Sequence, residues 1–329
     1  MFKRERLILS SCLGLFVTFG MILSAGTGSS DAADVKYPDK PIHIVVPMPA
    51  GGPHDVLARV IATKAKKYFG VPLVVINTPG AGGTIGSKQV MTSPPDGYTL
   101  MINHGGISAN YHTNTAEFNY DSFQPICRLA TGNECLATYV GAPFSDIKGL
   151  LDYAMKNPGR VKYAATSGGT SHLVMGAIEE AANIKFLFVP YQGEAPRTAA
   201  LAGHHVDLIS MTIKSASEYV KAGKFIILGV FNSERSKLYP ALPTLSEQGL
   251  KVNDTFEVRG LFAPKGIPKD RISFLESAFK KTLEDPECID ALYKAGQEPA
   301  YLDTVNYTKY LKDQDATIES NARRLNLKK

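Results

Sequence analysis

The chain of 329 residues has no tryptophan, only four cysteines and no strong excess of charge of either sign. Its 36 Lys and Arg residues against 31 Asp and Glu residues give a formal net charge of +5, without a dense basic tract. Nucleic acid is therefore not an expected partner. The apolar fraction of 44% is typical of a globular protein, and the length suffices for two domains with separate cores.

Long hydrophobic runs are also missing, except at the N-terminus. Basic residues within positions 3–6 precede an apolar run over 7–23, and small polar residues follow. This order is typical of a secretory signal peptide, and we predict residues 1–32 as that peptide, with cleavage after Ala32. The alternative is an uncleaved signal anchor, because the run approaches the ~17 residues that can span a membrane. We favour export to the periplasm or another extracytoplasmic compartment.

The cysteines and histidines show no metal-site spacing. Removal of the signal peptide leaves Cys127, Cys135 and Cys288. Cys127 and Cys135 could form a disulfide in an oxidising compartment, although small buried thiols are favoured. His204 and His205 are adjacent and would point to opposite faces of a strand, so no metal site is predicted.

Apolar runs and helical patterns alternate along the rest of the chain. The runs expected to be strands are 42–46, 72–76, 98–102, 161–165, 186–189, 206–209 and 225–230. From residue 268 onward the pattern is helical, and the last helix is predicted over 304–325. Such alternation predicts an α/β protein whose parallel sheets are covered by helices on both faces.

Loops of small residues follow several predicted strands, at residues 47–55, 77–86 and 166–171. In parallel sheets, ligands bind beyond the C-terminal ends of the strands, where these loops lie. The first turn of a helix presents unpaired N–H groups, so it can receive a carboxylate or phosphate without a charged side chain. Two halves of this kind predict a ligand cleft between lobes.

Six stretches carry a resemblance to a known family. They are Tyr37-Pro38-Asp39-Lys40-Pro41-Ile42, Val45-Val46-Pro47, Ala50-Gly51-Gly52, Asn77-Thr78-Pro79-Gly80-Ala81-Gly82-Gly83, Pro95-Asp96-Gly97-Tyr98-Thr99-Leu100 and Gly260-Leu261-Phe262-Ala263-Pro264-Lys265-Gly266. In this order they resemble the Bug-type extracytoplasmic solute receptors of the tripartite tricarboxylate transporter family, and the resemblance covers essentially the whole mature chain.

The resemblance implies a type II periplasmic-binding-protein fold, in which two α/β lobes enclose a ligand cleft and two strands cross between them. We expect the crossings near residues 127–140 and 255–262. Lobe 1 would then hold residues 33–132 and 256–329, and lobe 2 residues 133–255.

In this family a small carboxylate lies in the cleft, held by backbone amides, hydroxyls and ordered waters. Carried over by motif, the implied ligand-binding residues are Gly51, Gly52, Pro53, His54, Asp55, Gly80, Ala81, Gly82 and Gly83 in lobe 1, and Ser167, Gly168, Gly169, Thr170, Ser171, Tyr191 and Asp207 in lobe 2. No cofactor is implied. The expected partners are the carboxylate ligand and an integral-membrane permease of the same transporter type, and the expected state is a monomer.

Two histidines depart from the family pattern. His54 stands where the family has a small hydroxyl residue, and His104 lies in a loop where serine is common. Two imidazoles at the cleft would narrow it and add hydrogen-bond donors, with charge below neutral pH. The alternative is that one or both point to solvent. Asp207 likewise has two interpretations, a partner for a ligand ammonium or hydroxyl group and a capping acid.

The expected function is capture of a small organic acid for membrane uptake or sensing. Neutral donors with little positive charge suit a ligand with one to three carboxylates, including aromatic acids and amino acids. The alternative is a secreted hydrolase-like enzyme acting on a small ester or amide, with Ser167, His172 and Asp207 as the residue types of a triad. Their spacing gives no triad geometry, so we expect no enzyme.

Overall fold

The computed structural model describes residues 37–191, 193–232, 234–252 and 257–327. The predicted signal peptide lies outside these residues. Within them, no helix combines the length and the hydropathy needed to cross a membrane. The segment Tyr37–Lys329 forms one compact unit.

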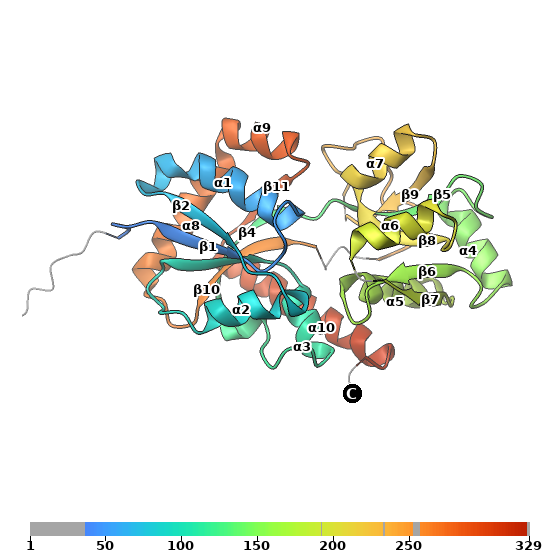
Figure 1. The fold of residues 1–329 in the computed structure, drawn as a ribbon, viewed down its shortest axis with the longest axis horizontal. Helices are drawn as coiled ribbons and strands as arrows, with labels where there is room; N and C mark the ends of the chain where they lie inside the picture. The colour runs from blue at the N-terminus through green and yellow to red at the C-terminus, as the bar shows by residue number, and fades with distance from the viewer. Residues whose placement is uncertain (1–36, 192, 233, 253–256, 328–329) are drawn as a thin grey trace, which may run out of the picture. The chain divides into compact units, whose positions relative to one another are not determined.

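Two β-sheets organise this unit (Figure 1). The first sheet has the strand order β11 (Glu298–Leu302), β4 (Phe123–Thr131), β10 (Arg259–Pro264), β3 (Thr99–Asn103), β1 (Ile42–Val46) and β2 (Leu73–Asn77). The second sheet has the order β7 (Leu187–Pro190), β6 (Lys162–Ala165), β8 (Leu208–Thr212), β5 (Glu134–Tyr139) and β9 (Phe225–Val230).

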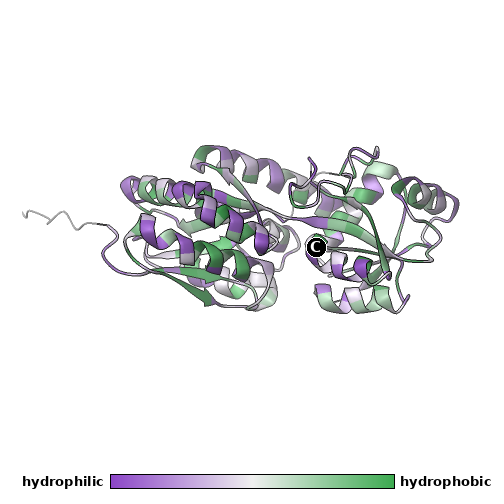
Figure 2. Cartoon of the chain, turned by 90° about the horizontal axis from the view of Figure 1, so that it is seen from above, coloured by the Kyte–Doolittle hydropathy of each residue, from purple (hydrophilic) through white to green (hydrophobic). Residues whose placement is uncertain are grey.

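Helices follow most of the strands. Those between strands of the first sheet, or after them, are α1 (Pro53–Phe69), α2 (Thr84–Met91), α3 (Gly106–His112), α8 (Lys269–Glu284), α9 (Pro286–Lys294) and α10 (Thr304–Arg324), with short 3-10 turns at Ala81–Gly83 and Tyr120–Ser122. Those between strands of the second sheet are α4 (Ile147–Lys156), α5 (Thr170–Ala182), α6 (Glu194–Ala202) and α7 (Ile213–Lys221). Figure 2 shows hydrophobic strands inside and hydrophilic residues on many helix surfaces.

Both sheets are mixed, so the expectation of parallel sheets is wrong in part. β1 pairs in parallel with β2 and β3, and β6 pairs in parallel with β7 and β8. β10 runs antiparallel to β3 and β4, and β5 runs antiparallel to β8 and β9. The strands β4, β5 and β10 flank the places where the chain passes between sheets. Of these, β10 runs opposite to β1 and β3, and β5 runs opposite to β6 and β8.

The crossing between β4 and β5 is short. β4 ends at Thr131 in the first sheet, and β5 begins at Glu134 in the second. The chain returns to the first sheet at Arg259, where β10 begins. The N-terminal end of β10 and the C-terminal end of β4 therefore lie at the same edge of the first sheet as the C-terminal ends of β1 and β3.

The helix α10 contributes to the cores of both sheets (Figure 1). Tyr307 and Leu311, near its start, pack with strand residues of the first sheet. Ile318 and Ala322, near its end, belong to the hydrophobic cluster of the second sheet. A single amphipathic helix thus links two cores that would otherwise be separate.

The cysteines are small buried core residues. Cys127, Cys135 and Cys288 are all free and buried. Cys127 packs in the core of the first sheet and Cys135 in that of the second, so the disulfide left open by the sequence is absent from the described residues. Burial raises the pKa of the Cys135 thiol, which keeps this thiol protonated.

Candidate functional site

A pocket of about 370 Å³ lies where the strand ends of the two sheets meet. We call it the ligand pocket. Its walls come from the loops after β1, β2, β3, β6 and β7 and from the segments at the crossings. The residues that line it are Met48, Pro53, His54, Gly82, His104, Gly106, Ala109, Asn110, Glu134, Thr166, Gly169, Thr170, Ser171, Gly193, Glu194, Arg197, Thr212, Glu257 and Arg259.

The first wall is the loop between β1 and α1. Gly51 has a φ of +79°, which favours glycine, and its N–H donates to Asp55 Oδ2 at 2.8 Å. Arg59 Nε donates to the same carboxylate oxygen at 3.0 Å. Burial raises the pKa of Asp55, but the hydrogen bonds from Arg59 and Gly51 outweigh burial and hold that pKa below its ordinary value. Asp55 therefore shapes the loop and does not line the ligand pocket.

Two imidazoles form the floor beside this loop. The rings of His54 and His104 meet edge to face, with their centroids 4.6 Å apart. Only 5% of His54 is exposed, and its Nε2 has no hydrogen-bond partner among the described residues. Burial, and then the neighbouring His104 and Arg259, lower the pKa of His54 well below its usual value. His54 is therefore neutral at physiological pH, with a nitrogen left for a ligand.

His104 is oriented by its own loop. The N–H of Gly106 donates to His104 Nδ1 at 2.7 Å, so a neutral ring carries its proton on Nε2. That nitrogen lies 3.8 Å from Glu257 Oε2. His54, His104 and Glu257 offer ligand atoms within 4.8 Å of one another, as a metal site would. Metal-binding histidines usually donate their second ring N–H, whereas this one accepts, so the cluster fits hydrogen bonding better.

Charged side chains line the pocket more densely than we expected. Arg259 Nη2 lies 3.8 Å from Glu257 Oε2, and the other oxygen of Glu257 accepts from Thr170 Oγ1 at 3.0 Å. Arg197 Nε donates to the carbonyl of Gly193 at 3.1 Å. Both arginines are buried. The pocket therefore holds more charged groups than the expected set of neutral donors, because two guanidinium groups from α6 and β10 and three glutamates line it.

The opposite wall is the N-terminus of α5. Ser171 Oγ accepts the N–H of Thr166 at 2.9 Å, which closes the loop after β6. Gly169, Thr170 and Ser171 line the pocket, so the first-turn amides of a 13-residue helix lie beside it. These amides and the helix dipole favour a negatively charged group there. The hydrogen bond from Thr170 to Glu257 also joins this wall to the crossing segment.

Seven of the predicted site residues come together in the ligand pocket. They are Pro53, His54, Gly82, His104, Gly169, Thr170 and Ser171. Those that do not line it are Gly51, Gly52, Asp55, Gly80, Ala81, Gly83, Ser167, Gly168, Tyr191 and Asp207. Most of these belong to the same loops and shape the backbone of the pocket wall.

Asp207 is a clear correction. It precedes β8, at the end of the second sheet opposite the ligand pocket. Its Oδ2 accepts the N–H of Lys162 at 2.7 Å, and Lys162 begins β6. This contact is that of a capping acid, the second of the two interpretations. Tyr191 also lies away from the pocket lining and packs against the core of the second sheet instead.

The arginines and glutamates of the pocket were missed at the level of sequence. Arg197 sits inside a helical pattern, and Arg259 directly precedes the matched stretch that begins at Gly260. These arginines are unusual because they are buried. The sequence around a lone arginine in an amphipathic helix does not show whether its side chain is buried. Glu134 and Thr212 are neighbours only through the pairing of β5 with β8.

The hydrolase constellation does not form. The ring of His172 stacks on Phe188, with centroids 4.1 Å apart, and its Nδ1 accepts the N–H of Gly168 at 3.3 Å. A triad would need that nitrogen to donate to an acid. Asp207 lies at the far end of the sheet, where it caps Lys162.

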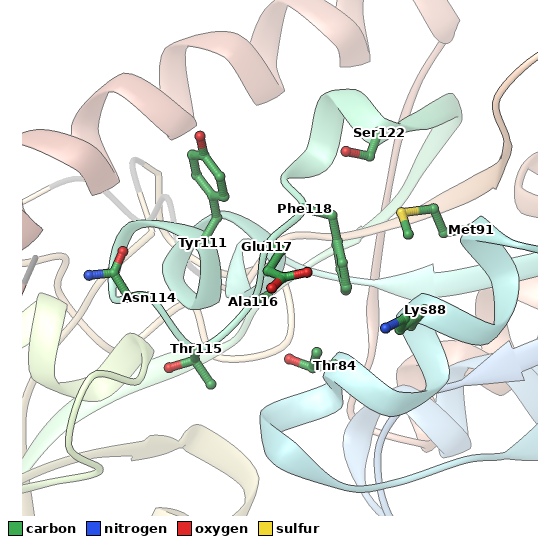
Figure 3. A pocket seen from close by; sticks show the side chains of 10 residues that line it. All are labelled: Thr84, Lys88, Met91, Tyr111, Asn114, Thr115, Ala116, Glu117, Phe118 and Ser122. Atoms are coloured by element: carbon green, nitrogen blue, oxygen red, sulfur yellow. The ribbon is translucent and has the colours of Figure 1, made fainter.

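A larger hollow of about 830 Å³ lies elsewhere, between α2 and the segment after α3 (Figure 3). Thr84 and Lys88 of α2 and Tyr111 of α3 are among the residues that line it. It contains none of the predicted site residues. Polar and apolar side chains both line it.

Solute-binding receptors with a periplasmic-binding-protein fold have two α/β lobes, strand-end loops that face each other and helix N-termini beside a shared pocket. This chain has the same features. The family model described as "Tripartite tricarboxylate transporter family receptor" matches residues 57–327. The chain belongs to this family, as the resemblance indicated. Members of the family are receptors and not enzymes, so the protein is a solute-binding receptor.

Relatives of similar length support the assignment. A protein encoded in the tcbD–tcbE intergenic region of Pseudomonas sp. (strain P51) is 33% identical over 289 residues, which are 86% of each chain. Protein BugT of Bordetella pertussis is 27% identical over 296 residues, or 88% of this chain and 89% of BugT.

Solved structures agree with the fold. A TctC solute-binding protein from Polaromonas superposes with a TM-score of 0.76 at 28% identity, covering 88% of this chain and 99% of that one. MatC from Rhodopseudomonas palustris, solved with malate, has a TM-score of 0.71 at 25% identity and covers 87% and 100%. An R. palustris protein solved with adipate has a TM-score of 0.74 at 27% identity and covers 87% and 97%.

Proposed function

We propose that this receptor captures a small organic acid in the ligand pocket. The observation that carries the proposal is a pocket walled by both sheets, with two buried arginines and the N-terminal amides of α5. Each of these groups favours a carboxylate. The malate and adipate held by two structural relatives support the same ligand class.

The proposed ligand contacts come from both walls. They are the seven predicted residues that line the pocket, Pro53, His54, Gly82, His104, Gly169, Thr170 and Ser171, together with Arg197 and Arg259. Closing of the lobes would bury most of the ligand and bring these groups to it, as in other concave sites.

Isothermal titration of the purified protein with mono-, di- and tricarboxylates, aromatic acids and amino acids tests the function. We expect at least one acid to bind with one-to-one stoichiometry and to raise the melting temperature. A ligand at a hundred times its Kd adds about 2.7 kcal/mol to the free energy of unfolding. Binding of uncharged sugars only would contradict the proposal.

A variant of His54 tests the site itself. His54→Thr should change the Kd or the preferred acid, because the unpaired Nε2 of a buried imidazole is lost. His43→Thr is the matched control, since His43 is an exposed histidine on β1. If both variants keep the ligand profile and Kd of the wild-type protein, His54 is not a ligand contact.

The lobe boundaries and the export signal belong to this proposal. We place lobe 1 at 33–132 and 256–329 and lobe 2 at 133–255. The membership of β1–β4, β10 and β11 in the first sheet and of β5–β9 in the second supports this division. Residues 1–32 would direct export, and N-terminal sequencing of the exported protein should begin at Ala33.

The proposed partner is an integral-membrane permease of the tripartite tricarboxylate type, which would recognise the ligand-bound receptor. We propose that the receptor itself is a monomer. Light scattering coupled to size exclusion should give the mass of one mature chain, and a mass twice as large would contradict this.

A further inference from the structure

A second pocket of about 320 Å³ adjoins the ligand pocket. The two share Pro53, Thr212 and Arg259 as lining residues. Its other walls come from α7 and from the turn that leads into β11. Arg259 therefore lines both of two adjoining spaces, and its side chain is near Glu257 of the ligand pocket and Gln297 of the second.

Hydrogen-bond donors without partners lie in the second pocket. Arg259 is 3% exposed and Asn133 is 7% exposed. Arg259 Nε and Asn133 Nδ2 are buried and have no acceptor among the described residues. Nη1 of the same guanidinium donates to Gln297 Oε1 at the long distance of 3.4 Å. Because buried donors are normally paired, this pair of groups indicates a missing acceptor.

The charges around these donors are positive on balance. Lys214 lines the second pocket, and its aliphatic chain lies against Gly296. Ser215 lies in the first turn of α7, a helix of nine residues that begins after Thr212. The acidic lining residue, Glu218, forms an ion pair with Lys221 at 3.2 Å. The balance of charge in the ligand pocket is different, because three glutamates and two arginines line it.

We propose that the second pocket is the subsite for the far carboxylate of a dicarboxylate ligand. This inference rests on the proposed function. One carboxylate would lie in the ligand pocket and the other against Arg259, Asn133 and Lys214. The ligand would therefore carry negative charge at both ends of an apolar chain.

Arg259 and His104 lie close to the same carboxylate. Arg259 Nη2 and His104 Nε2 each lie 3.8 Å from one oxygen, Oε2 of Glu257, so they are at most 7.6 Å apart. A series of linear dicarboxylates therefore measures which chain length the two pockets accept.

Titration calorimetry with acids of graded length tests the subsite. The wild-type protein, Lys214→Met and Asn133→Ala are titrated with succinate, glutarate, adipate and pimelate, and with hexanoate as a monocarboxylate. We expect both variants to raise the Kd of the best dicarboxylate at least tenfold. The Kd of hexanoate should stay within twofold of the wild-type value. Lys309→Met is the matched control, because Lys309 is an exposed lysine of α10, and it should change neither Kd. Thermal melts confirm that each variant is folded.

The other outcomes overturn the subsite in distinct ways. If the variants weaken the binding of hexanoate as much as that of the dicarboxylate, or weaken the binding of neither acid, the second pocket does not hold a carboxylate of the ligand. Two anions bound per protein would show a separate anion site instead. Failure of every acid to bind the wild-type protein would overturn the proposed function and the subsite together, whereas the first two results leave the proposed function standing.

Discussion

Asp55 shows how a residue beside a pocket supports it without touching the ligand. Its carboxylate receives the N–H of Gly51 and the Nε of Arg59, and this holds the loop between β1 and α1. His54, one residue earlier, points the other way and enters the ligand pocket. Neighbours in the first turn of one helix thus have different roles, because consecutive side chains leave the helix about 100° apart.

The loop function of Asp55 leads to a pH-dependent prediction. Its folded-state pKa lies below the ordinary value of 3.8, so the carboxylate stabilises the fold above about pH 4. This contribution is lost as the pH falls through the folded-state pKa. Asp55→Asn should lower the free energy of unfolding by about 1–2 kcal/mol at pH 7, less than a fully buried charged hydrogen bond because Arg59 is half exposed.

Urea unfolding at pH 7 and at pH 3 measures this difference. The gap between Asp55→Asn and the wild-type protein should shrink as the pH falls below 3.8, because protonation of Asp55 progressively removes the contribution of its charge, whereas asparagine is neutral at every pH. Asp313→Asn is the control, since Asp313 is an exposed acid on α10. A gap that stays constant with pH would show that packing, and not charge, explains the effect.

At the residue scale, the sequence predicted the backbone loops of the site better than the side chains that line it. The loops around Gly51, Gly82 and Gly169 were predicted because small residues after an apolar run have a local signature. Arg259 and Glu257 have none, since their place in the pocket depends on β10 lying between β3 and β4. The direction of His54 was also open, because a helical first turn can face either solvent or pocket.

At the element scale, the Gly-rich loop after β2 serves close packing. A Cβ on Gly86 would come within 2.6 Å of the carbonyl oxygen of Thr78 and 3.0 Å of Pro47 Cα, both backbone atoms. Gly86 lies in α2, where alanine would otherwise gain helix propensity. The close approach explains why the loop needs a small residue where it meets the helix.

Gly86→Ala should therefore destabilise the protein, against its helix propensity. We expect a loss of about 1–3 kcal/mol in the free energy of unfolding, the usual cost of overpacking. Lys88→Ala is a control in the same helix at an exposed position and should change stability by less than about 0.5 kcal/mol. Chemical denaturation compares them, and a neutral or stabilised Gly86→Ala would contradict the packing argument.

Elements with local periodicity were predicted well, and crossing strands were not. The predicted strands at 42–46 and 225–230 match β1 and β9, and the last helix matches α10 within a residue. The strands β4, β5, β10 and β11 have no alternation with helices to signal them. Their pairing partners are distant in sequence, so only the family resemblance placed the crossings near them.

At the scale of the whole molecule, α10 couples the two cores. Ile318 is 0% exposed and packs in the cluster of the second sheet, although α10 follows strands of the first. Arg324, at the end of the helix, donates to the carbonyl of Gly176 and lies 3.4 Å from Glu180, both in α5. The sheets therefore share a helix as well as two crossings.

Because the cores share α10, we expect the segment 37–329 to unfold in one cooperative transition. Calorimetry should show a single peak whose van't Hoff and calorimetric enthalpies agree. Ile318→Ala should remove about 2–5 kcal/mol of stability, the usual cost of truncating a buried isoleucine. Val305→Ala, in the same helix at a side chain 76% exposed, should cost less than about 0.5 kcal/mol.

The form of the Ile318→Ala transition decides between two accounts of the molecule. If α10 is the main link, weakening its contact with the second core should broaden the peak or split it, and ligand should restore a single peak by engaging both walls of the pocket. If the crossings alone couple the lobes, the variant should melt earlier with an unchanged peak shape. Two peaks already present in the wild-type protein would show that the cores unfold independently, contrary to the shared helix.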